Sequence, residues 1–258
     1  MTDQPDPESR APAGRPPSRS RPTPRTGNPV PEADVAAMFD EIAPVYDRVN
    51  TLMTAGGDAR WRGAAVRATQ LRSGGSAIDV ACGTGKLSLA LAERVGPFGR
   101  VVGVDLAPHM IEQARLVSKD LIQLEFVVGN ALALPFEGDT FDAATIAFGL
   151  RNLADFEAGF RELARVVRPG GRVVCLELST PRPRIWRVVY LAAFRLLPPL
   201  TAALFARGKS YRYLPASLEG FPDPAALAAT MTRVGLRQVG YRRLALGAVA
   251  LHSGVVAG

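Results

Sequence analysis

The sequence predicts an α/β protein built on a doubly wound, mostly parallel sheet of seven strands. From residue 77 to residue 178, short apolar runs alternate with segments of helical spacing, which is typical of βαβ units. A turn containing Gly83 and Gly85 joins the first expected strand to the helix that follows it. Ligands of such sheets bind at the carboxyl ends of the strands, so we expect a binding crevice at that edge.

Each expected element follows from the spacing of its apolar residues and from the glycine and proline residues that bound it. The run from Arg168 to Gly171 (Arg-Pro-Gly-Gly) predicts a helix stop and a turn before the fifth strand. The expected strands are 77–81, 101–105, 124–128, 142–147 and 172–178, followed by an antiparallel pair at 237–245 and 247–256; the expected helices are 86–95, 108–117, 153–167 and 224–235.

The N-terminal region divides into two parts. Residues 1–33 are rich in proline, arginine, serine and threonine, so they predict a disordered tail, and residues 34–258 are expected to form the folded domain. Within 35–70 the apolar spacing predicts helices that precede the first strand. Such helices can cover a ligand site as a lid or simply pack on the sheet, and both interpretations remain open.

The glycine turn is compatible with several ligands. A phosphate loop would need glycine at Val80 and a hydroxyl at Leu87, and a dinucleotide fingerprint would need a third glycine at Ser88. Neither pattern is complete. A structural turn that binds nothing also remains open for the turn considered alone.

S-adenosylmethionine fits the turn better than these ligands. Its sites have an acidic residue in the first strand, here Asp79, and another that ends the second strand, here Asp105. Asp105 follows Gly85 by 20 residues, and its carboxylate can accept both ribose hydroxyls. The sequence therefore favours S-adenosylmethionine as the cofactor, with Gly83 and Gly85 bringing the backbone close to it.

Composition and charge narrow the class of protein. Apolar residues make up 47% of the 258 residues, and Cys82 and Cys175 are expected to be buried hydrophobes. No metal-site spacing and no signal-peptide core are found, so we expect a cytoplasmic, reduced protein without a metal. The net charge of +7 is uneven, with 15 basic and four acidic residues from Arg161 onward. That excess fits nucleic acid or an anionic membrane surface.

Residues 181–215 combine positive charge with apolar bulk. They contain seven basic residues and no acidic one, while arginines and a Pro198-Pro199 pair interrupt the apolar run. The segment therefore does not predict a transmembrane span. It could contact a membrane surface, line the substrate entrance, or form an amphipathic helix with a solvated basic face.

Five motifs give the chain a resemblance to the quinone-ring C-methyltransferases over about residues 36–256. That family converts demethylmenaquinol to menaquinol and methylates the corresponding ubiquinol precursor. The motifs are Met38-Phe39-Asp40-x-Ile42-Ala43-x-x-Tyr46-Asp47-x-x-Asn50, Thr145-Ile146-Ala147-Phe148-Gly149-Leu150-Arg151-Asn152, Arg165-Val166-Val167-Arg168-Pro169-Gly170-Gly171 running to Leu176-Glu177-Leu178-Ser179, Ser210-Tyr211-Arg212-Tyr213-Leu214-Pro215, and Val249-Ala250-Leu251-His252.

The resemblance implies a Rossmann-like class I S-adenosylmethionine-dependent methyltransferase with N-terminal lid helices. Thr84 and the loop amides would hold the methionine carboxylate, and Asp105 the ribose. Asn130 would form a hydrogen bond with the adenine amine, and the backbone amide of Ala131 would contact the adenine ring. Ala147 stands where the family often has a serine that contacts the cofactor, and Lys86 where it usually has aspartate.

The resemblance also implies catalytic residues and a substrate. Arg151 would stabilise the phenolate of the acceptor ring, Asn152 would orient a ring oxygen, and Tyr46 and His252 are weaker candidates. A buried Arg151 paired with an acid is the structural alternative. The expected substrate is polyprenylated demethylmenaquinol, which the protein would bind at the inner face of the plasma membrane. A nucleic-acid partner is not expected.

Other functions remain open at this point. The acceptor could instead be the ubiquinone precursor 2-methoxy-6-polyprenyl-1,4-benzoquinol or another small aromatic or lipid molecule. A non-catalytic assembly subunit that binds the cofactor is a further alternative. The sequence also leaves the oligomeric state open, a homodimer being one alternative.

Overall fold

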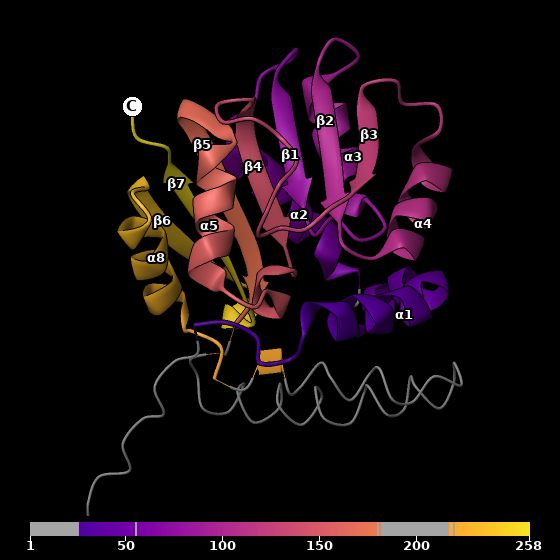
Figure 1. Cartoon of the computed structure of the whole chain (residues 1–258), viewed down its shortest axis with the longest axis horizontal. Helices are drawn as coiled ribbons and strands as arrows, with labels where there is room; N and C mark the ends of the chain where they lie inside the picture. Colours follow the sequence, from indigo (N-terminus) through magenta and orange to yellow (C-terminus); the bar gives the residue numbers. More distant parts are fainter. Residues whose placement is uncertain (1–25, 55, 180, 182–216, 219) are drawn as a thin grey trace, which may run out of the picture.

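The computed structural model describes residues 26–54, 56–179, 181, 217–218 and 220–258. Seven strands form one sheet in the order β3-β2-β1-β4-β5-β7-β6 (Figure 1). All neighbours pair in parallel except β7, which is antiparallel to β5 and to β6. The strands are β1 (Ser76–Val80), β2 (Arg100–Asp105), β3 (Leu124–Val128), β4 (Phe141–Ala147), β5 (Val167–Leu178), β6 (Arg237–Leu244) and β7 (Val249–Val255).

Helices cover both faces of the sheet, because its central strands are apolar on both sides. The adjacent residues Ala77 and Ile78 of β1 point to opposite faces and belong to two different core clusters. Helices α5 and α8 contribute to the first cluster, and α2, α3 and α4 contribute to the second. The helices are α1 (Glu32–Met53), α2 (Gly57–Thr69), α3 (Lys86–Val95), α4 (Pro108–Ser118), α5 (Phe156–Arg165) and α8 (Pro224–Arg233), with short 3-10 turns η1 (Leu150–Asn152) and η3 (Ala245–Gly247).

The predicted doubly wound fold is confirmed, including the antiparallel pair at the C-terminus. The fifth strand starts earlier than expected, at Val167, and the segment expected to be a turn belongs to β5. An irregularity in the β4–β5 register lies there: Val167 pairs with Phe141, and the next pair is Arg172 with Ala143. The positive φ of Gly170, +81°, accommodates the bend.

The expected tail boundary at residue 33 is wrong for residues 26–33. The backbone N–H of Asn28 donates to the carbonyl of Leu153 over 2.7 Å, and that of Phe156 donates to the carbonyl of Thr26 over 2.9 Å. Asn28 is buried. The folded domain therefore begins at or before Thr26, and the part of the expected tail in residues 1–25 lies outside the described residues.

Helix α1 positions the site. Figure 1 shows it crossing the edge of the sheet where the parallel strands end. Its Ile42 and Ala43 pack on Ala107 and Met110 at the start of α4, and this cluster fixes the helix over the strand ends. Among the described helices, none is both long and apolar enough to cross a membrane. The basic segment 182–215 lies outside the described residues.

Candidate functional site

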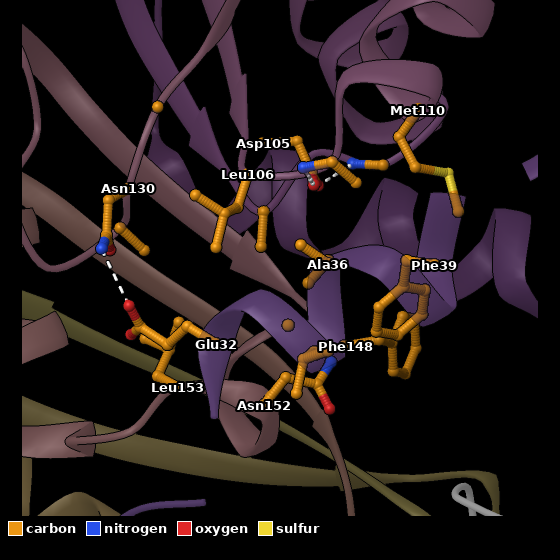
Figure 2. A pocket seen from close by; sticks show the side chains of 18 of the residues that line it. Glu32, Ala36, Phe39, Asp105, Leu106, Met110, Asn130, Phe148, Asn152 and Leu153 are labelled. Atoms are coloured by element: carbon orange, nitrogen blue, oxygen red, sulfur yellow. Dashed lines mark hydrogen bonds between the residues drawn. The ribbon is translucent and has the colours of Figure 1, made fainter. Parts of the chain in front are cut away.

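A cavity lies between α1 and the carboxyl ends of β1, β2, β3 and β4 (Figure 2). The cavity thus lies at the edge of the sheet where the sequence predicted a binding crevice, and each of its walls comes from a segment that ends at this edge. The lining residues are Glu32, Val35, Ala36, Phe39 and Tyr46 from α1, Ala81 and Gly83 after β1, Asp105 at the end of β2 with Leu106, Ala107 and Met110 after it, Gly129, Asn130 and Ala131 after β3, and Ala147, Phe148, Gly149, Asn152 and Leu153 from the end of β4 onward.

Asp105 is held by the backbone at the cavity wall. Its Oδ2 accepts a hydrogen bond from the Gly83 N–H over 2.7 Å, and its Oδ1 accepts one from the Ala107 N–H over 3.0 Å. Burial raises the pKa of this carboxyl, and the two backbone amides act against that rise. A carboxylate has about four acceptor positions, so Asp105 retains capacity for a pair of hydroxyls.

Glycine is required at Gly85. Its φ is +81°, and a Cβ at this position would come within 2.6 Å of the Phe126 ring. Gly83 also has a positive φ, +56°, and it lines the cavity, whereas Gly85 does not. The turn thus places one glycine against the ligand space and the other against the core.

Asp79 lies behind the turn and is not among the lining residues. Its Oδ2 accepts from the Ser88 hydroxyl and its Oδ1 from the Thr145 hydroxyl, each over 2.7 Å. Burial raises the pKa of Asp79 to about 6, while these two hydrogen bonds and Arg62 act to lower it. The residue therefore ties α3 and β4 to β1, and its support of the glycine turn is indirect.

Thr84 connects the glycine turn to α1. Its hydroxyl donates to Asp47 Oδ1 over 2.9 Å, and it is not among the lining residues. Lys86 Nζ lies 3.4 Å from the same Asp47 oxygen and 3.7 Å from Asp58 Oδ2 of α2. In this arrangement the Thr84 hydroxyl holds the first helix, whereas the sequence predicted that it holds a ligand carboxylate.

Asn130 and Ala131 line the cavity as predicted, but the Asn130 side chain has two protein partners. Its Oδ1 accepts from the Leu132 N–H over 2.8 Å, and its Nδ2 donates to Glu32 Oε2 over 2.8 Å. Sequence reasoning did not identify Glu32 as a site residue. A glutamate in the first turn of a helix is common, since it complements the helix dipole, and nothing else near Glu32 in the sequence points to a binding site.

The end of β4 and the following turn form another wall. Ala147 and Asn152 line the cavity there, and Tyr46 faces them from α1. The Tyr46 ring packs edge-on against Phe39, with 5.9 Å between the ring centroids. These three predicted site residues therefore meet in one cavity with Asp105.

Arg151 is buried and is not among the lining residues. Its Nη1 lies 2.6 Å from Glu177 Oε1, and it also donates to the carbonyl of Phe148. This is the buried pair that the sequence left open as an alternative. His252 also lies away from the cavity: its Nε2 is 2.9 Å from the carbonyl of Pro224, and its ring packs on Tyr241.

The sequence matches a known family along most of its length. Residues 28–256 match the model of the ubiE/COQ5 methyltransferase family. The chain is 45% identical over 219 residues to a demethylmenaquinone methyltransferase of Thermus thermophilus, an alignment that covers 84% of this chain and 99% of that protein. It is 39% identical over 220 residues to the ubiquinone/menaquinone biosynthesis C-methyltransferase UbiE of Geobacter sulfurreducens, covering 84% and 86%.

Solved structures of more distant proteins share the fold. A SAM-dependent methyltransferase from Aquifex aeolicus aligns with a TM-score of 0.61 at 16% identity, covering 82% of this chain and 98% of that one. A SAM-dependent methyltransferase from Thermotoga maritima, a possible histamine N-methyltransferase, aligns with a TM-score of 0.59 at 17% identity, covering 85% and 98%. At these identities the likeness establishes the fold alone.

Proposed function

Because the chain belongs to the ubiE/COQ5 methyltransferase family, we propose that it transfers the methyl group of S-adenosylmethionine to a ring carbon of demethylmenaquinol, forming menaquinol. The name of its relative from Thermus thermophilus, demethylmenaquinone methyltransferase, supports this acceptor. The observation that carries the proposal is the cavity in which Asp105, held by two backbone amides, lies close to the glycine turn and under the first helix.

The residues of the cavity fit the cofactor. Asp105 would accept the ribose hydroxyls, Gly83 would let the methionine portion approach the backbone, and the Ala131 amide would meet the adenine ring. The buried Oε1 of Glu32 has no hydrogen-bond partner among the described residues, as expected where a ligand donor completes the site. When bound, S-adenosylmethionine supplies an electrophilic methyl group on its sulfonium sulfur.

Positioning and exclusion of water are the main tasks of the protein in such a transfer. We assign Asn152 the role of donating to a ring oxygen of the quinol, where negative charge develops as the ring carbon becomes nucleophilic. Tyr46 would pack against the ring from α1 and keep water out. The buried pair of Arg151 with Glu177 supports a positioning role for Arg151, which braces the turn that carries Asn152.

Complementation of a strain that accumulates demethylmenaquinone tests this function. The full chain should restore methylated menaquinone among the extracted quinones, as measured by mass spectrometry. A variant with Asp105→Ala, expressed to the same level, should not. Restored methylation of the ubiquinone precursor alone, in a strain blocked at that step, would contradict the proposed acceptor. Failure with both acceptors would contradict quinone methylation altogether.

A further inference from the structure

Asn130 and Glu32 form a hydrogen-bond chain whose polarity is fixed. The Leu132 N–H can only donate, so the Asn130 atom that it meets, 2.8 Å away, must be the carbonyl oxygen Oδ1. The amide nitrogen Nδ2 therefore points the other way and donates to Glu32 Oε2 over 2.8 Å (Figure 2). A donor at this position requires an acceptor on Glu32.

The second oxygen of Glu32, Oε1, is buried and unsatisfied. Among the described residues no group donates a hydrogen bond to it. Glu32 lines the cavity together with Leu106, which follows β2, and with Asn130 and Ala131, which follow β3. A buried acceptor without a partner is costly, so a ligand in this cavity should present a donor to Oε1.

Asn130 is a weaker acceptor for an amino group than Glu32. An amine must be met by an acceptor, and the Asn130 oxygen already accepts from the Leu132 N–H, which leaves it one of its two lone pairs. Its other polar atom is a donor that is directed to Glu32. The buried carboxylate oxygen Oε1 of Glu32, which has no hydrogen-bond partner among the described residues, is the stronger acceptor for the amine that the family resemblance brings to Asn130.

We propose that Glu32 Oε1 accepts a hydrogen bond from the 6-amino group of the adenine of S-adenosylmethionine, so that the first helix determines the specificity for the base. The proposal rests on the cofactor of the proposed function. A 6-oxo group in place of the amine has no hydrogen to donate. Its oxygen and Glu32 Oε1 would then face each other as two acceptors without a hydrogen between them. The site should therefore reject hypoxanthine, and Asn130 would act by fixing the orientation of Glu32.

Calorimetric titration with two ligands measures this specificity directly. S-Adenosylhomocysteine carries the 6-amino group, and S-inosylhomocysteine carries a 6-oxo group at the same position. The unaltered protein should bind the adenine ligand about 10- to 100-fold more tightly, the range expected for one hydrogen bond to a charged group.

Glu32→Gln should move the preference toward the 6-oxo ligand. Because Asn130 Nδ2 must meet an oxygen, the new amide should turn its oxygen to Asn130 and its NH₂ toward the ligand. The affinity for S-adenosylhomocysteine should fall about tenfold or more, and that for S-inosylhomocysteine should rise. Asp34→Asn is the matched control, since Asp34 is exposed in the same first turn of α1, and it should leave both affinities unchanged.

Two results would overturn the inference. An equal loss of affinity for both ligands in Glu32→Gln would mean that Glu32 only holds the helix in place. Unchanged affinities for both would mean that the base does not meet this residue. Glu32→Ala gives a second check, since it should weaken binding of the adenine ligand and spare the 6-oxo ligand. Binding of neither ligand by the unaltered protein would instead contradict the proposed cofactor itself, and the inference with it.

Discussion

Asp47 of α1 accepts a hydrogen bond from the hydroxyl of Thr84 in the glycine turn, with 2.9 Å between the oxygens. Lys86 Nζ lies 3.4 Å from the same carboxylate oxygen of Asp47. The first helix is thus fastened to the glycine turn by side chains, in addition to its apolar contacts with α4. Since α1 forms one wall of the cavity, these contacts should govern how readily a bound cofactor leaves.

Replacing Asp47 with alanine should loosen this wall. Loss of one hydrogen bond and one partly exposed ion pair is worth about 1–2 kcal/mol, so dissociation of S-adenosylhomocysteine should become about 5- to 30-fold faster. Stopped-flow fluorescence can measure that rate. Arg48→Ala, at an exposed position of the same helix, is the control and should not change it. An unaltered rate in Asp47→Ala would mean that the contact does not limit release.

Asp105→Ala tests the ribose site. A carboxylate that accepts hydrogen bonds from two hydroxyls contributes about 1.5–3 kcal/mol to the binding free energy. The affinity of the variant for S-adenosylmethionine should therefore fall by about 10- to 200-fold. Asp120→Ala, at an exposed position after α4, serves as the control. Calorimetry on a variant shown to be folded by circular dichroism makes the measurement. Full affinity in Asp105→Ala would remove this residue from the site.

Asp79 should make the stability of the fold depend on pH. Its pKa is raised from 3.8 to about 6 in the folded protein, so between these values the folded state binds more protons than the unfolded one. The free energy of unfolding should therefore fall as the pH rises through this window, by about 3 kcal/mol from this group. The loss is nearly complete at about pH 7, one unit above the pKa of the folded protein.

Asp79→Asn isolates this contribution, because asparagine can keep partners in Ser88 and Thr145 without a charge. The stability of the variant relative to the unaltered protein should increase between about pH 4 and pH 7, as measured by urea unfolding at several pH values. A constant difference over that range would show that Asp79 does not titrate in this way.

Two truncations test where the domain begins. Removal of residues 1–33 deletes the buried Asn28 and its bond to the Leu153 carbonyl, and it deletes Glu32. The melting temperature and the affinity for S-adenosylhomocysteine should both fall. Removal of residues 1–25 should leave both nearly unchanged, as their composition predicts. Equal behaviour of the two truncated proteins would contradict a role for residues 26–33.

The basic segment carries a prediction that rests on sequence alone. We propose that Arg184, Arg187 and Arg195 bring the protein to an anionic membrane surface, where each basic side chain adds about 1 kcal/mol. Replacing all three with glutamate should abolish sedimentation with anionic liposomes and reduce activity on a long-tailed quinol more than on a short-tailed one in detergent. Retained liposome binding with equal loss on both substrates would contradict this role.

The architecture was predictable because its signals are local. Apolar runs, the glycine turn and the acid that ends β2 each lie within a few residues, and the sheet edge where they meet follows from parallel topology. The place of β7 between β5 and β6 was not predictable, since an antiparallel pair can join a sheet by either strand. The start of the domain was missed because the partner of Asn28 is Leu153, far along the chain.

The site was predictable only where the backbone determines the role of a residue. Asp105 and Gly83 follow from their positions at the end of β2 and after β1, and the structure brings them together. Glu32 and Asp47 act through contacts with loops distant in sequence, so nothing next to them reveals those contacts. The pairing of Arg151 with Glu177 joins a turn to a neighbouring strand, and the sequence could offer it only as an alternative.

Methyl transfer by the purified protein tests the central claim most directly. The full chain would be incubated with S-adenosylmethionine labelled in its methyl group and with short-tailed demethylmenaquinol or the ubiquinol precursor, and the products followed by mass spectrometry. The account predicts that the label appears on the ring carbon of menaquinol, and that Asp105→Ala greatly slows the transfer at S-adenosylmethionine concentrations well below the Kd of the variant. The account would be contradicted if only the ubiquinol precursor were labelled, or if neither acceptor were labelled.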